Sequence, residues 1–126
     1  MLGVSEMNFS GLLAKLMGRE TPRPLDQPMR FDESTFSRPG QDGFAAAWSD
    51  VRKIVGYKID LLMVDEIRMD FQLATNVTVV ITEENLGFSE FMVEVERRFQ
   101  SVAGWHAKVS QPPFAVSATV LYESLN

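Results

Sequence analysis

The fold is decided by residues 66–82, which read EIRMDFQLATNVTVVIT. In the first half every second side chain is apolar, at Ile67, Met69, Phe71 and Leu73. Such alternation is typical of a strand that has one face on a core and the other in water. Asn76 suits a turn because it tolerates a positive φ, and the alternation resumes at Val77, Val79 and Ile81. The stretch therefore predicts an antiparallel hairpin.

A helix is predicted next along the chain, at residues 88–100. Its apolar residues recur at the spacing of one helix face, and they are Phe88, Phe91, Met92, Val95 and Phe99. Acidic residues come early in this segment and basic residues late, an order that complements the helix dipole. Gly87 suits the start of the helix and Gly104 its end. The apolar face is expected to pack on the sheet.

Residues 44–58 allow two interpretations, since a helical spacing and a strand-like alternation both run through them. The helical positions are Phe44, Trp48, Val51 and Val55. The density of valine and isoleucine favours a strand, so we predict a helical turn near 44–48 followed by a strand over 51–58. Residues 119–122 predict a short last strand. The expected fold is α+β, with a small antiparallel sheet of about four strands packed against one amphipathic helix in the C-terminal half.

The first 43 residues differ in character from the rest. A short amphipathic helix is predicted within residues 1–18, capped by Ser10. Residues 19–43 are expected to form an irregular arm, because prolines break regular elements at Pro22, Pro24, Pro28 and Pro39. Anchors of this arm on the domain surface are expected at Met29, Phe31 and Phe36. The predicted organisation is an N-terminal helix and arm over residues 1–43, and one α+β domain over residues 44–126.

The chain has 126 residues, no cysteine and a formal net charge of -5. This length suits one domain, and the missing cysteine excludes disulfides, thiolate catalysis and cysteine zinc sites. An acidic protein repels phosphate backbones, so no nucleic-acid partner is expected. No apolar run approaches the roughly 20 residues that a membrane span needs, and the N-terminus lacks a signal-peptide pattern. The sequence therefore predicts a cytoplasmic protein without a membrane span.

Groups that could carry chemistry are few. His106 is the single histidine, and a general base or zinc ligand would need partners that the sequence does not supply. Asp60 and Asp65 bracket the connection between two predicted strands, and Glu83 and Glu84 follow another strand. Either pair could do acid–base work in a shared cleft, but solvated loops explain them more simply. We therefore predict no enzyme, no cofactor and no metal site.

A wider pattern spans residues 48–123. It consists of Trp48, Val51, Ile54, Tyr57, Lys58, Asp60, Asp65, Ile67, Glu83, Gly87, Phe88, Pro112-Pro113-Phe114-Ala115 and Thr119-Val120-Leu121-Tyr122. This pattern resembles a group of small bacterial proteins of unknown function, which implies a bacterial origin and a compact domain but no catalytic residue. The element order is broadly similar to bacterial pleckstrin-homology-like modules. The small size and acidic charge resemble those of immunity proteins that neutralise toxins.

The favoured functional hypothesis is a non-catalytic protein-binding module, with an immunity-like role as one version of it. Contacts to a partner are expected at the aromatic residues Phe31, Phe36, Trp105 and Phe114. The first alternative is a homo-oligomer, in which residues 1–43 pack on a neighbouring copy. The second alternative is a small enzyme that uses Asp60, Asp65, Glu83 or His106 in a common pocket.

Overall fold

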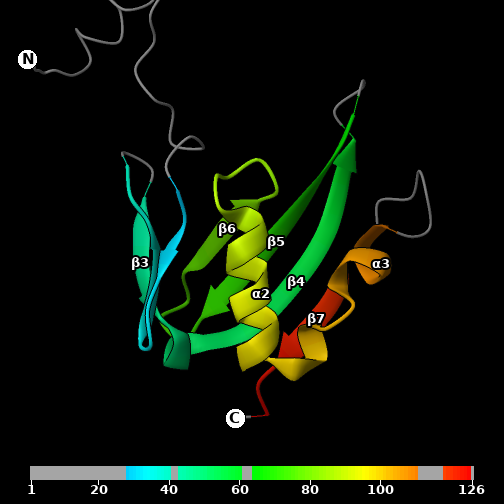
Figure 1. The fold of residues 1–126 in the computed structure, drawn as a ribbon. Helices are drawn as coiled ribbons and strands as arrows, with labels where there is room; N and C mark the ends of the chain where they lie inside the picture. Colours follow the sequence, from blue (N-terminus) through cyan, green and yellow to red (C-terminus); the bar gives the residue numbers. More distant parts are fainter. Residues whose placement is uncertain (1–27, 41–42, 61–63, 111–117, 126) are drawn as a thin grey trace, which may run out of the picture.

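The computed structural model describes residues 28–40, 43–60, 64–110 and 118–125 (Figure 1). Within these ranges the chain forms two antiparallel sheets, two α-helices and two short 3₁₀ turns. The predicted α+β class is therefore confirmed. The helix that the sequence predicts within residues 1–18 lies outside the described residues, as do the first part of the predicted arm and Phe114.

The larger sheet has four strands in the order β6-β5-β4-β7. Their bounds are Val51–Asp60 for β4, Asp65–Leu73 for β5, Thr78–Thr82 for β6 and Thr119–Glu123 for β7. The predicted hairpin is confirmed as β5 and β6, which pair Phe71 with Val79 and turn through Asn76 at a φ of 65°. Both the strand over 51–58 and the short last strand are present as well.

The smaller sheet has three strands in the order β1-β2-β3. Their bounds are Arg30–Phe31 for β1, Thr35–Arg38 for β2 and Phe44–Ala47 for β3. The arm is thus not irregular over its described part, because Pro28 and Pro39 flank strands β1 and β2 rather than interrupt them. Strand β2 also pairs with β3 across residue 43, where the sequence divides the arm from the domain.

The helical turn predicted near 44–48 is wrong, because residues 44–47 form strand β3 and a 3₁₀ turn, η2 (Trp48–Asp50), follows. The pairing of Phe36 with Ala46 explains the difference. It places Ala46 in the core beside Phe36, so pairing with the neighbouring strand β2 overrides the local helical spacing.

The predicted long helix is confirmed as α2 (Phe88–Arg98), which Gly87 precedes with a φ of 78°. A 3₁₀ turn, η3 (Gln100–Val102), follows and leads to a second helix, α3 (Trp105–Ser110). The sequence pattern does not predict α3, because Val109 is the one fully buried residue among its six. The ammonium of Lys58 lies 3.0 Å from the carbonyl oxygen of Ser110 at the end of α3, where a positive charge favours a helix terminus.

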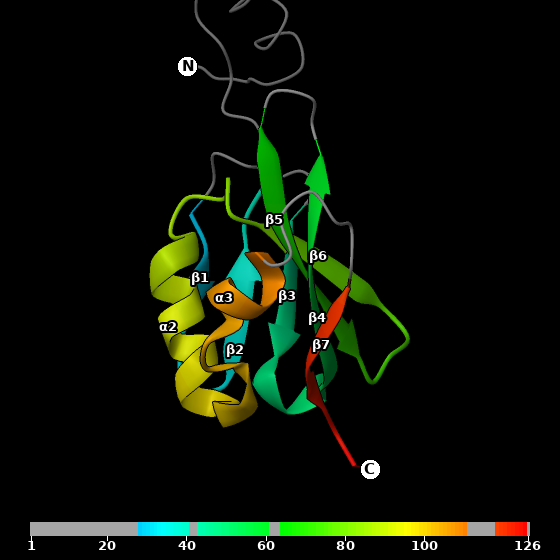
Figure 2. The same ribbon diagram turned by 90° about the vertical axis from the view of Figure 1, so that its right-hand side faces the viewer.

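The core lies between the larger sheet and the elements that cover one of its faces. Figure 2 shows α2, α3 and the smaller sheet together on this covered face. The centre of the core is aromatic: Phe36, Phe71 and Phe91 are all fully buried, with ring centroids 5.6–5.7 Å apart. No described helix is long and apolar enough to cross a membrane.

Candidate functional site

The four aromatic residues predicted as partner contacts have different surroundings. Phe36 is fully buried in the domain's own core, so its side chain has no surface to offer a partner. Phe31 is 40% exposed and lies beside α2, with its ring 6.3 Å from that of Phe91. Trp105 is half-buried against Phe88, and its indole N–H donates to Glu96 over 3.2 Å. Phe114 lies outside the described residues.

Of the predicted acid–base residues, Asp65 and Glu83 make contacts that support the sheet. Asp60 ends β4 and Asp65 begins β5, and the two are register partners; the Asp65 carboxylate lies 3.7 Å from the Lys58 ammonium. A Glu83 carboxylate oxygen accepts the backbone N–H of Ile67 over 2.8 Å and so continues the β5–β6 ladder. His106 is exposed on α3. Within the described residues, no group of three or more His, Cys, Asp or Glu side chains could hold a metal ion.

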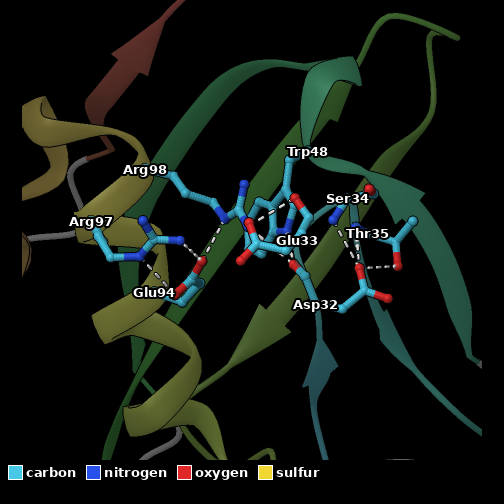
Figure 3. A network of polar contacts seen from close by, with 8 residues as sticks. All are labelled: Asp32, Glu33, Ser34, Thr35, Trp48, Glu94, Arg97 and Arg98. Carbon is cyan, nitrogen blue, oxygen red and sulfur yellow. Dashed lines mark hydrogen bonds and ion pairs between the residues drawn. The ribbon is translucent and has the colours of Figure 1, made fainter.

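A network of polar contacts joins the β1–β2 turn to the end of α2 (Figure 3). The Arg98 guanidinium lies 4.5 Å from the Trp48 ring centroid and donates to a Glu94 carboxylate oxygen over 2.6 Å. It also donates to the carbonyl oxygens of Asp32 and Glu33, over 3.0 and 2.9 Å. Stacking and charge-assisted hydrogen bonds together fix this side chain in one position.

The β1–β2 turn is closed by Asp32. Its Oδ1 atom accepts the backbone N–H groups of Ser34 and Thr35 and the hydroxyl of Thr35. These hydrogen bonds, first of all the one from the Thr35 N–H, hold the pKa of Asp32 below its ordinary value of 3.8. The Trp48 indole N–H donates to the Asp32 carbonyl, so the turn is tied to the aromatic core as well.

This network borders an open depression of about 570 Å³, lined by Glu33, Ser34, Thr35, Ala47, Trp48, Ser49, Arg98 and Phe99. The lining includes a cation, but Arg98 is committed to Glu94 and to two backbone carbonyls. The pKa of Glu94 is in turn held below its ordinary value, mainly by the hydrogen bond from Arg97 and also by Arg98. The depression is therefore bounded by groups that fasten the smaller sheet to α2.

Replacing Asp32 with alanine should destabilise the protein at neutral pH and have less effect in acid. The folded-state pKa of Asp32 is depressed, so its contribution is present above the unfolded value and is lost as pH falls through the folded value. Thermal unfolding of both proteins at pH 7 and at about pH 2.5 tests this, since the second pH lies below the ordinary carboxyl range. An equal difference in melting temperature at both pH values would contradict this role of the carboxylate.

A different surface is formed by the larger sheet on the face opposite α2. In Figure 2 no described element lies over this face, which we call the open face. Its side chains alternate with core residues such as Ile54, Phe71 and Val79. One row of register partners crosses all four strands and consists of Val120, Val55, Asp70 and Val80. Three of the four side chains in this row are aliphatic, and Val120 is 51% exposed.

The next row consists of Tyr57, Arg68 and Thr82, of which Thr82 is buried at 7% exposure, and its hydroxyl accepts the backbone N–H of Glu84. The Tyr57 hydroxyl donates to Asp70 over 2.9 Å, and burial together with this bond raises the pKa of Tyr57 above its ordinary value. Arg68 donates to Glu66 over 2.8 Å, a bond that raises the pKa of Arg68. The open face thus combines aliphatic side chains with a tyrosine, an arginine and acids held in fixed positions.

No protein-family model, curated protein or solved structure matches this chain. The arrangement of its own residues is therefore the basis for assigning a function.

Proposed function

We propose that this chain is a non-catalytic protein-binding domain and that its open face contacts the partner. The observation that carries the proposal is the row of Val120, Val55, Asp70 and Val80, with Tyr57 in the next row, on a sheet face over which no described element lies. Exposed aliphatic patches with a polar rim mark interaction sites. Tyrosine and arginine are the residue types that recur at energetic centres of such sites.

The energetic scale supports binding through this row. Complete burial of a valine side chain contributes roughly 1.5–3 kcal/mol. These valines are already partly covered by their neighbours in the sheet, so about 1 kcal/mol remains for each. Three such side chains with a tyrosine suit a specific but moderate interaction. A non-catalytic role is supported by the contacts of two of the candidate acids: Glu83 accepts the backbone N–H of Ile67, and Asp65 pairs with Lys58.

A matched pair of valines tests the proposal. Val120 lies on the open face and is 51% exposed, whereas Val93 lies on α2 and is 68% exposed. The full chain, its V120E variant and its V93E variant would each be immobilised and incubated with lysate of the native cell. Burying an unpaired carboxylate in a contact costs about 2 kcal/mol or more, which weakens binding roughly 30-fold.

The expected result is a stoichiometric partner that the wild-type chain and V93E retain and V120E loses. Circular dichroism of the three proteins would show that each is folded. Retention by V120E together with loss by V93E would place the contact on α2 instead and contradict the proposal.

A further inference from the structure

We propose that the open face binds a second copy of this chain, an inference that rests on the proposed binding role of that face. The two copies would pack face to face. The two-fold axis that relates them would lie in the interface, perpendicular to the strands, midway between the row of Arg68 and the row of Asp70. A two-fold interface brings the same patch from both copies together, so every contact occurs twice. Such an interface needs charges of opposite sign in neighbouring rows, and the open face has them.

The alternation lies along β5. Arg68 and Asp70 are partly exposed on this strand and have opposite charges, whereas Glu66, one row further, is only 6% exposed and is bonded to Arg68 of its own chain. The proposed axis places Arg68 of one copy opposite Asp70 of the other, and Asp70 opposite Arg68. Both ion pairs are formed by one operation, whereas a shift by one row would oppose two arginines or two acids.

The neighbouring strand β4 fits the same axis. Tyr57 pairs with Arg68 and Val55 pairs with Asp70 in the register, so Tyr57 of one copy lies opposite Val55 of the other. An aromatic ring against an aliphatic side chain is a favourable contact between packed sheets. The same axis therefore pairs opposite charges on β5 and brings Tyr57 against Val55 on β4.

The edges of the larger sheet are less suited to a second copy. Arg38 donates to the carbonyl oxygen of Val80 over 3.0 Å on edge strand β6. Ser101 donates to the carbonyl oxygen of Leu121 over 2.7 Å on edge strand β7. Side chains at these positions hinder the addition of another strand. Association through the face avoids them.

The area of the face sets the expected strength. Strands about 4.8 Å apart, with outward residues about 7 Å apart along each strand, give a four-stranded face of roughly 500 Å². Burial of this face on both copies removes roughly 1,000 Å² in total, which is at the lower limit for specific association. A weak, concentration-dependent dimer is therefore expected rather than a permanent one.

Charge exchange between the two partners of the proposed ion pair gives a decisive test. In R68D both positions of the pair are acidic, and in D70R both are basic, so each variant alone should repel its own copy. A mixture of R68D with D70R forms both ion pairs again across the interface. Sedimentation equilibrium of the full-length proteins, over two decades of concentration, measures each case.

The wild-type mass should rise from 14.2 kDa towards twice that value as concentration increases. Each variant alone should associate at least tenfold more weakly, and the mixture should recover an affinity within about threefold of wild type. Circular dichroism shows whether each variant is folded. If a single variant does not fold, the double variant R68D/D70R is measured in place of the mixture, because it also restores both ion pairs.

A wild-type chain that stays monomeric at every concentration would overturn the inference. The inference would also fail if the mixture, or the double variant, associated no more strongly than a single variant. These outcomes leave the proposed function separately testable. If the wild type is monomeric but retains a lysate protein that V120E does not retain, the open face binds a different protein and not a second copy.

Discussion

Replacing Phe36 with alanine is expected to lower the free energy of unfolding by about 3–5 kcal/mol. The Phe36 ring is fully buried, and its centroid lies 4.4 Å from that of Trp48 and 5.6 Å from that of Phe71. No neighbour can fill the space without leaving its own contacts, so a cavity would remain at the junction of both sheets and α2. Urea unfolding followed by tryptophan fluorescence measures the loss.

Phe31 provides the matched control for this experiment. It lies directly opposite Phe36 in the β1–β2 pair, but 40% of its surface is exposed. Its replacement by alanine should cost less than half as much, because less apolar surface leaves the core. A loss below about 1 kcal/mol for F36A would mean that residues 28–40 do not contribute to the core as the structure shows.

Replacing Arg98 with methionine is expected to cost about 2–3 kcal/mol, the range for charged hydrogen bonds lost in a poorly solvated place. Methionine keeps much of the side-chain length but loses the bonds to Glu94, Asp32 and Glu33 and the cationic stacking on Trp48. The β1–β2 turn would then be tied to the helix less firmly. Its backbone amides should exchange hydrogen faster than in the wild type.

Arg97 is the control for Arg98, because both side chains bond to Glu94. The Arg97 side chain is 61% exposed and that of Arg98 is 17% exposed. An exposed ion pair contributes little, so R97M should destabilise the protein much less than R98M. An equal loss of unfolding free energy in R97M and R98M would show that the Arg98 bonds to the β1–β2 turn add no stability.

The elements that the sequence predicts best are those whose local pattern agrees with their packing. Strand β5 alternates core residues with charged ones, and α2 has a continuous apolar face that is buried as expected. Asn76 occupies the turn between β5 and β6 with positive φ. In these segments, periodicity alone determines both the element and the face that it buries.

The smaller sheet could not be predicted in the same way, because its strands depend on each other. Strand β1 has two residues and β2 and β3 have four each, which is too short for periodicity to indicate a strand. Their stability comes from Phe36 in the aromatic core and from Arg98, which is distant in sequence. Alanine and proline in this region favour other local structures, and only the tertiary contacts override them.

The open face could not be located from the sequence either. In β4 and β6 both faces contain apolar residues, such as Ile54 and Val55 or Val79 and Val80, so the alternation does not distinguish the inner side from the outer. The register with β5, whose outward residues are charged, resolves this. The aromatic residues predicted as contacts instead lie in the core or beside α2, apart from Phe114, which is outside the described residues.

The most direct test of the open face as the binding surface is side-chain footprinting of the full chain, alone and with its partner bound. Hydroxyl radicals label exposed aromatic and aliphatic side chains, and mass spectrometry measures the labelling of Tyr57, Val120 and Val93. Binding through the open face predicts strong protection of Tyr57 and Val120 and unchanged labelling of Val93. Protection of Val93 and Trp105, with Tyr57 and Val120 labelled as in the free chain, would contradict it.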